Sequence, residues 1–315
     1  MNYFIQRLLS AIPVLLGITI IVFFIISLIP GDPATAILGS YATPENVKLL
    51  NEQLGLDKGL VQRYFIWLGN LVQGDLGRSF ALNRPVLDEI LERFNATLIL
   101  SGTAFILCSV VGVLIGTISA FKQYTITDKI ITFTVLTGIS LPSFFLGMMM
   151  ILLFAVNLQW LPVSGMYAIY GGGDFLDLIH HLIMPAIALA LVATGVVGRI
   201  TRNSVLEILR QDYIRTARAK GLTEFNVIRN HAIKNSLNPV VTAVSGWFAS
   251  LLAGAVFVEY IFGWNGLGKE IVNALNNLDL PVIMGSVLVI AFMFIIINIL
   301  VYIIYAWIDP RVKLN

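Results

Sequence analysis

The stretch YIRTARAKGLTEFNVIRNHAIKNSLNPVVT, residues Tyr213–Thr242, is the most basic part of the chain and lies between two long apolar segments. When this stretch and the residues before it are drawn as a helix, apolar side chains recur at spacings of three and four. The apolar face consists of Leu206, Leu209, Tyr213 and Ala217. The opposite, polar face consists of Ser204, Glu207, Gln211, Arg215 and Arg218. The spacing therefore predicts an amphipathic helix between two apolar segments.

A glycine turn is expected to end this helix. Gly221 interrupts the apolar spacing at a position typical of a helix C-terminus. Thr223 is suited to cap a second helix, in which Phe225, Ile228 and Ala232 share one face. We expect a hairpin of two helices with a basic surface and small side chains at its tip. A solvated basic loop that only sets membrane topology is the alternative interpretation.

Composition indicates a membrane protein. The chain has 315 residues, of which 57% are hydrophobic and 12% are charged, and soluble domains carry roughly twice that charged share. We therefore expect an all-α integral membrane protein with several spans. Cys108 is the only cysteine, which excludes an intrachain disulfide and a cysteine metal cluster. Membrane topology explains the basic residues, so the sequence does not support nucleic-acid binding.

Hydropathy predicts six transmembrane helices. They are Leu8–Ile29, Ala96–Phe121, Ile130 to about Val156, Leu182–Gly198, Pro239–Val258 and Leu280–Ile308. Pro142 is expected to kink the third span. The first span also resembles a signal peptide, but its apolar core is too long and five more spans follow. The sequence therefore predicts that this first helix is retained.

The longest polar stretch, Pro30–Arg93, separates the first two spans. Thr43 and Pro44 are typical of a helix start, and Leu60–Leu71 reads as a second, aromatic-rich helix. We interpret the stretch as a small folded helical insertion on one face of the membrane. A role in receiving a docking protein is the alternative.

The distribution of lysine and arginine predicts the orientation. If the N-terminus lies inside, the inner segments are residues 1–7, 122–129, 199–238 and 309–315. These segments hold 13 of the 20 Lys and Arg residues and 5 of the 18 Asp and Glu residues. Cytoplasmic loops carry an excess of Lys and Arg. We therefore expect both termini and the basic hairpin to be cytoplasmic and the helical insertion to be extracytoplasmic.

No Asp, Glu, Lys, Arg or His lies deep in the six predicted spans. An ion-coupled carrier normally needs such a residue near the middle of the membrane. We therefore expect a pore-forming subunit that takes its energy from a separate motor. A stand-alone channel or carrier would instead transport in liposomes without an ATPase. An intramembrane enzyme would turn over a substrate as a single purified chain.

Two other features are candidate ligand sites. Gly263–Glu270 nearly spells a phosphate-binding loop, but Glu270 stands where a Ser or Thr must reach the magnesium ion. The segment also follows a membrane helix and faces outside, so we do not assign it to nucleotide. His180 and His181 are expected at the outer membrane face, where a structural role and a contact with a nickel chelate are both open.

Asp212–Gly221 reads DYIRTARAKG and resembles the cytoplasmic loop with which permease subunits of ATP-binding-cassette (ABC) importers dock on their ATPases. The match is to the dipeptide, oligopeptide, nickel and glutathione branch. Arg215 and Thr216 replace the Glu and Ala of the general motif, and Lys234 stands where sugar importers have a proline. Asn265 replaces a proline of the branch. Further matches are Gly31-Asp32-Pro33, Leu54–Lys58, Gly74–Gly77 with Ser79, and Asp279–Val282.

The resemblance implies the type I ABC importer permease fold. Residues 1–93 would hold the first transmembrane helix and the extracytoplasmic helical region. Residues 94–308 would form a five-helix core with a cytoplasmic coupling loop at about 200–238. The chain would be half of a translocation pathway for peptides, glutathione or a nickel chelate. It would be a multi-pass protein of a bacterial or archaeal cytoplasmic membrane and would not be an enzyme.

The resemblance also implies the partners. They are a paralogous permease, two ABC ATPases that bind the ATP and magnesium, and an extracytoplasmic solute-binding protein, so this chain itself needs no cofactor. The residues implied in ATPase docking are Tyr213, Arg215, Thr216, Ala217, Arg218, Ala219, Lys220, Gly221 and Leu222. Our hypothesis is that the apolar members, Tyr213, Ala217 and Leu222, pack into a groove on the ATPase. The cations Arg215, Arg218 and Lys220 would pair with acidic residues at its rim.

Overall fold

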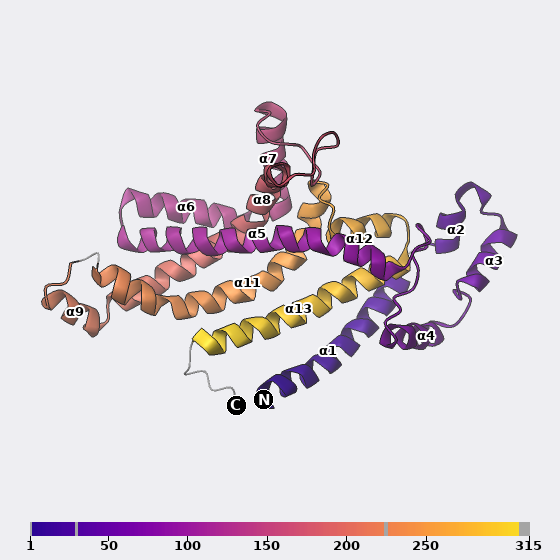
Figure 1. The fold of residues 1–315 in the computed structure, drawn as a ribbon, viewed down its shortest axis with the longest axis horizontal. Coiled ribbons are helices and arrows are strands. Elements are labelled where there is room, and N and C mark those ends of the chain that lie inside the picture. The colour runs from indigo at the N-terminus through magenta and orange to yellow at the C-terminus, as the bar shows by residue number, and fades with distance from the viewer. Residues whose placement is uncertain (1, 29–30, 224–225, 309–315) are drawn as a thin grey trace. The chain divides into compact units, whose positions relative to one another are not determined.

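The computed structural model describes residues 2–28, 31–223 and 226–308. It forms two compact units, which are described separately. The first unit comprises residues 1–97 and 265–296, and the second comprises residues 98–264 and 297–314. Within the described residues all the regular elements are helices (Figure 1), and Arg78 and Pro85 form an isolated β-bridge. The expected all-α architecture is confirmed.

The first unit contains the predicted helical insertion. Its helices are α1 (Asn2–Ser27), α2 (Pro33–Leu38), α3 (Pro44–Gln53), α4 (Leu60–Val72) and α12 (Leu267–Asn276), together with the first parts of α5 (Val86–Phe121) and α13 (Leu280–Ile308). A short 3-10 turn, Gly39–Tyr41, follows α2. The Thr43 hydroxyl accepts a hydrogen bond from the Asn46 N–H at 3.3 Å, as expected for the cap of α3.

Aromatic packing holds this unit together. Phe23 of α1 lies edge-on to Tyr64 of α4, with ring centroids 5.4 Å apart. The Tyr64 hydroxyl shares a hydrogen bond of 3.0 Å with the Thr19 hydroxyl, so the polar end of this buried ring is satisfied. Val86 of α5 and Val282 of α13 belong to the same buried cluster. The core of the unit therefore joins the first apolar helix, the insertion and the starts of α5 and α13.

Asp279 joins two segments of this unit that are distant in sequence. Its carboxylate accepts hydrogen bonds from the Ser79 hydroxyl at 2.5 Å and from the N–H groups of Phe80 and Ala81 at 3.0 Å each. Asp279 is only 2% exposed. A buried carboxylate with three donors is satisfied. The Gly74–Ser79 segment and the Asp279–Val282 segment, noted separately in the sequence, therefore meet in the fold.

The second unit is built around α8 (Phe175–Leu209), which packs against α6 (Ile126–Ser140), α7 (Ser143–Met150) and α11 (Lys234–Ile261). Its remaining helices are α9 (Asp212–Ala219), the π-helical turns Ile151–Asn157 and Val227–Ile233, and the rest of α5 and α13. The middle of α8 is rich in alanine and glycine, and its buried residues include Ala186, Ala190 and Gly195. Small residues let neighbouring helices approach closely.

Three of the described helices are long and apolar enough to cross a membrane: Val86–Phe121, Phe175–Leu209 and Leu280–Leu300. The count rises to five if each of two bent helix pairs forms one span, and Ala11–Ser27 is a shorter apolar helix. The kink predicted at Pro142 is a complete break, because α6 and the helix after it differ in direction by 107°. Leu141 and Pro142 are both extended there, and proline disfavours the helical conformation of the residue before it.

Candidate coupling site

A short amphipathic helix, α9, follows α8 after a two-residue break. Helix α8 ends at Leu209, and Gln211 adopts an extended conformation before α9 begins at Asp212. The predicted continuous helix is therefore wrong at this point. The break changes the direction in which the following side chains point around the helix axis. Residues 206–217 therefore do not share the single apolar face that a spacing of three and four residues predicted.

The buried face of α9 consists of Ile214, which is 0% exposed, and Ala217, which is 7% exposed. Both pack against Val227, and Ile208 of α8 joins the cluster. Tyr213, which the sequence placed on the apolar face, is 42% exposed, whereas Ser204 of the predicted polar face is buried. Both observations correct the predicted faces. The break at Gln211 explains the exposure of Tyr213, whereas Ser204 lies before the break and is buried as part of α8 itself.

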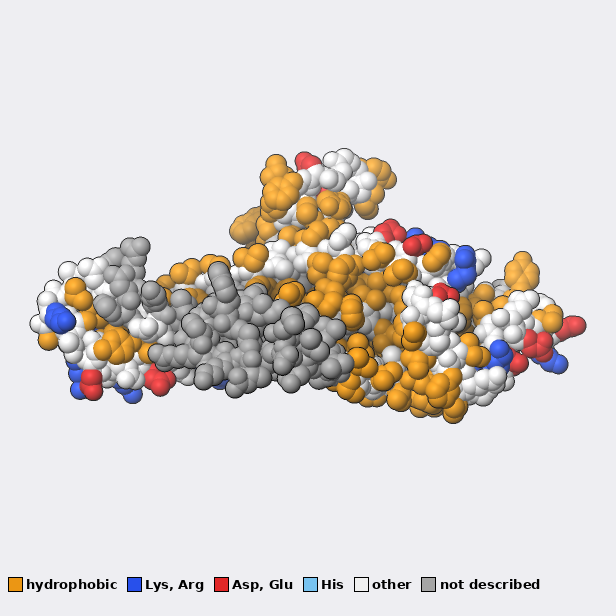
Figure 2. All heavy atoms as spheres, turned by 60° about the horizontal axis from the view of Figure 1, so that its bottom comes forward, with side chains coloured by type: hydrophobic (Ala, Val, Ile, Leu, Met, Phe, Trp, Pro, Cys, Tyr) orange, Lys and Arg blue, Asp and Glu red, His pale blue; other side chains and the backbone are white. Residues whose placement is uncertain are grey.

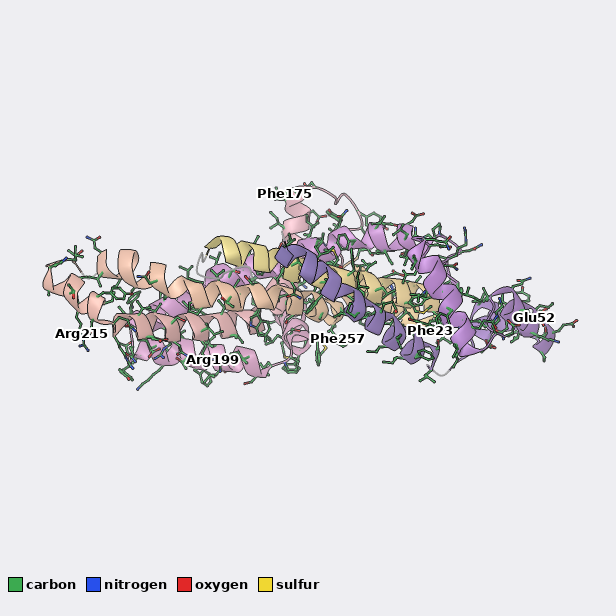
Figure 3. All side chains as sticks on the ribbon, turned by 90° about the horizontal axis from the view of Figure 1, so that it is seen from below. Phe23, Glu52, Phe175, Arg199, Arg215 and Phe257 are labelled. Carbon is green, nitrogen blue, oxygen red and sulfur yellow. The ribbon has the colours of Figure 1, made fainter. Side chains whose placement is uncertain are left out.

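The outer surface of the hairpin is exposed and largely basic. In Figure 2, lysine and arginine side chains are visible around α9, together with a few Asp and Glu side chains. The exposed members of the predicted docking set are Tyr213, Arg215, Thr216, Arg218, Ala219, Lys220, Gly221 and Leu222. Arg215, labelled in Figure 3, forms an ion pair of 3.3 Å with Asp212. Exposed pairs of this kind contribute at most about 1 kcal/mol, so Arg215 is readily available to another partner.

Gly221 forms the predicted turn. Its φ of +79° lies in the left-handed region that glycine adopts without strain. The Thr223 carbonyl then accepts a hydrogen bond from the Val227 N–H at 3.0 Å, as expected if the second helix begins near Thr223. Phe225 lies outside the described residues. Ala232 is buried, as the predicted stripe requires.

An ion pair that no sequence pattern indicated lies near the base of the hairpin. Arg202 of α8 donates to both carboxylate oxygens of Asp128 in α6, from Nε at 3.0 Å and from Nη2 at 2.9 Å. The Ser119 hydroxyl of α5 donates to Asp128 at 2.5 Å and accepts from the Arg202 Nε at 3.0 Å. This two-point geometry is the strong form of an arginine–carboxylate pair. Three helices are thereby joined two turns before α8 ends.

The other candidate sites have structural partners. Glu270 lies 3.7 Å from the Arg93 side chain, which also pairs with the buried Glu89 at 3.3 Å. The His181 Nδ1 lies 3.1 Å from an Asp177 carboxylate oxygen. The His180 Nε2 shares a hydrogen bond of 3.1 Å with the Trp160 carbonyl. Within the described residues, no group of three or more His, Cys, Asp and Glu is placed to hold a metal ion.

Solved transporters share part of this fold. The chain of an inward-facing MetNI methionine ABC transporter aligns over 71% of this chain and 97% of its own length, with a TM-score of 0.56 and 15% identity. A chain of an amino acid ABC transporter crystallised with histidines aligns over 72% of this chain and 95% of its own, with a TM-score of 0.50 and 16% identity. At this identity the likeness concerns the fold alone.

Sequence relatives cover nearly the whole chain. The dipeptide transport system permease protein DppB of Alkalihalophilus pseudofirmus is 42% identical over 99% of both chains. The protein of the same name from Escherichia coli K12 is 40% identical over 99% of both chains. A putative peptide transport system permease protein of Brucella abortus is 42% identical over 98% of both chains.

Two family descriptions match the sequence itself. Residues 1–101 match the N-terminal region of binding-protein-dependent transport system membrane components. Residues 112–314 match the binding-protein-dependent transport system inner membrane component. In this family ATP is bound by separate ATPase subunits, and the permease subunit of the importer is not an enzyme. The chain therefore belongs to the family of binding-protein-dependent transport system inner membrane components, as the permease subunit of an importer.

Proposed function

We propose that this permease imports dipeptides or other short peptides. The observation that carries the proposal is the match, at 40–42% identity over at least 98% of the chain, to permeases whose names specify dipeptide or peptide transport. Glutathione and nickel chelates are the competing cargoes. The cargo reaches the permease on an extracytoplasmic solute-binding protein.

The proposed topology has six spans with both termini in the cytoplasm. It adds α1 and the two bent helix pairs to the three long apolar helices. The excess of Lys and Arg at the α8–α9 end supports a cytoplasmic position for the hairpin. In this arrangement residues 1–93 supply the first span and an extracytoplasmic insertion, and residues 94–308 supply the five-helix core. A paralogous permease completes the pathway, and each permease binds one ATPase.

The proposed docking surface is the outer face of α9 with the turn after it. Tyr213 and Leu222 are 42% and 40% exposed, and they offer apolar contact to a groove on the ATPase. Arg215, Arg218 and Lys220 pair with acidic residues at its rim. Thr216, Ala219 and Gly221 are small residues, so the ATPase can come close to the backbone of α9 and its turn. Ala217 supports α9 from beneath instead of entering the groove, because its side chain is buried with Ile214.

The hairpin is connected to the membrane core through α8. A displacement of α9 by ATP-driven closure of the ATPases acts on the end of α8, where Arg202 is bonded to Asp128 of α6. Helices α6 and α8 then move together because the charged pair resists separation. Closure of the ATPases opens the pathway outward, and hydrolysis returns it to the inward-facing state.

Uptake measurements test the cargo. Cells lacking this permease, and the same cells with the gene restored, are given a radiolabelled dipeptide, glutathione or nickel. We expect dipeptide uptake to depend on the gene, with glutathione and nickel uptake unchanged. Gene-dependent nickel uptake with unchanged dipeptide uptake would contradict the proposed cargo.

Gly221→Leu tests the docking role of the hairpin. Among the described residues other than its chain neighbours, none has an atom within 4 Å of a Cβ added at Gly221. The cost of the substitution is therefore the backbone strain at φ +79°, about 1–2 kcal/mol. We expect the variant to reach the membrane but to lose peptide uptake and co-purification of the ATPases.

Gly171→Leu is the matched control, because Gly171 has a φ of +71° and equally open surroundings in the loop before α8. It carries the same strain away from the hairpin and should leave ATPase binding intact. Normal uptake by Gly221→Leu would refute the docking role.

A further inference from the structure

A cavity of about 260 Å³ lies between α5, α6 and α8, close to the Asp128–Arg202 pair. One part of its wall is apolar and is formed by Ile131, Val135, Leu136, Gly116 and Gly198. The other part is polar and is formed by Arg199, Arg202, Asn203, Ser119 and Thr132. Pockets that enclose a whole small ligand measure roughly 300–1,000 Å³. This cavity is therefore suited to part of a larger amphipathic molecule.

The two arginines of the cavity differ in their partners. Arg202 is neutralised by Asp128, 2.9 Å away. Arg199 is exposed, and its side chain forms no hydrogen bond or ion pair within the part of the chain that the structure describes. Figure 3 labels Arg199 on α8 and Arg215 on α9, the helix that follows the end of α8. An uncompensated cation beside an apolar pocket favours a ligand with one anionic group and one apolar chain.

The surroundings of the cavity combine exposed apolar side chains with exposed cations. On α6, Ile130, Phe133 and Leu136 are 60%, 73% and 49% exposed, which suits contact with lipid chains. Lys122 and Lys129 flank Asp128 in the sequence and are exposed. Clusters of Lys and Arg at the cytoplasmic ends of spans attract anionic lipids. Apolar side chains and cations thus occur together where α5, α6 and α8 meet.

We propose that this cavity binds an anionic phospholipid of the inner leaflet. The phosphate is held by Arg199 and Asn203, and part of one acyl chain enters the pocket beside Val135 and Leu136. Charge complementarity and the apolar lining together select this ligand over a zwitterionic lipid. The assignment to the inner leaflet rests on the proposed cytoplasmic position of the hairpin. Lipid binding is measured without transport, so a failure of the lipid site can be distinguished from a failure of the proposed function.

The test measures retained lipid on the purified transporter complex by native mass spectrometry. The complex is extracted from nanodiscs of phosphatidylcholine alone or mixed with phosphatidylglycerol. We expect Arg199→Gln to reduce retained phosphatidylglycerol about ten-fold or more, because charge-assisted hydrogen bonds to the phosphate are lost. Val135→Phe keeps the charge but fills the pocket, and it should reduce retention as well.

Arg210→Gln is the matched control, because Arg210 is an exposed arginine at the end of the same helix that does not line the cavity. Its retention should stay close to that of the wild type, since salt screens a distant charge beyond about 8 Å. Equal losses in Arg199→Gln and Arg210→Gln would overturn the proposal. So would undiminished retention in Arg199→Gln. If Val135→Phe does not fold, the comparison of Arg199→Gln with Arg210→Gln decides whether the cavity binds the lipid.

Inorganic phosphate is the probe that separates a lipid site from a simple anion site. Phosphate added at millimolar concentration should not displace phosphatidylglycerol, because it lacks the acyl chain that fills the pocket. Displacement by phosphate would overturn the assignment to a lipid.

Discussion

Asp279 illustrates what a single residue contributes to this protein. Its carboxylate is the shared acceptor for the Ser79 hydroxyl and for two backbone N–H groups that follow it. A buried donor that loses its acceptor costs about 1–3 kcal/mol. The side chain therefore fixes the segment before α5 to the start of α13.

Asp279→Ala should lower the free energy of unfolding by about 2–3 kcal/mol, because it leaves these donors without an acceptor. Thermal unfolding of the purified protein in detergent measures the change. Asp57→Ala is the control, because Asp57 is exposed and such surface changes stay within about 0.5 kcal/mol. An Asp279→Ala protein as stable as the control would show that the three hydrogen bonds contribute little.

At the scale of elements, the packing of α5 on α8 depends on two glycines of α5. A Cβ added at Gly112 would lie 2.7 Å from a Val197 side-chain carbon. A Cβ added at Gly116 would collide with the Gly198 carbonyl and lie 2.6 Å from the Thr201 Cβ. These two glycines, four residues apart, therefore form a small-residue face that lets α8 approach α5 closely.

Gly116→Ala should destabilise the protein by about 1–3 kcal/mol, since the added methyl group must displace the backbone of α8. Gly102→Ala in the same helix is the control, because in the described part of the chain no atom outside the adjoining turns of α5 lies within 4 Å of its added Cβ. The control should be neutral or stabilising by up to about 1 kcal/mol, as alanine favours the helix. Unfolding midpoints of the two variants provide the comparison. Equal midpoints would argue against close packing at Gly116.

At the scale of the whole molecule, the proposed topology places the hairpin inside the cell and the loop before α8 outside. Tyr170 in that loop is 92% exposed, and Arg215 is exposed on α9. Cys108 is buried, so it should not react with a maleimide that cannot cross the membrane. Single introduced cysteines therefore report the side on which each segment lies.

In intact cells we expect the impermeant maleimide to label Tyr170→Cys but not Arg215→Cys. Permeabilised cells should show labelling of both variants, because both positions are exposed to solvent. Labelling is read as a mass shift on a gel. If Arg215→Cys reacts in intact cells, the hairpin is extracellular and the proposed ATPase docking is excluded.

The sequence by itself determined the helical class and the basic hairpin with its turn at Gly221. These features follow from local hydropathy, charge and the conformational freedom of glycine, which each segment carries alone. The sequence also indicated the importer family through short motifs such as Asp212–Gly221, and the family match over residues 112–314 agrees with this.

Only the tertiary structure decided which residues meet. It showed that Ile214 rather than Tyr213 forms the buried face of α9, because the break at Gln211 changes the phase of the helix. It paired Asp128 with Arg202 and Asp279 with Ser79. These contacts join residues 74 and 200 positions apart, and their energies depend on packing that no local pattern encodes.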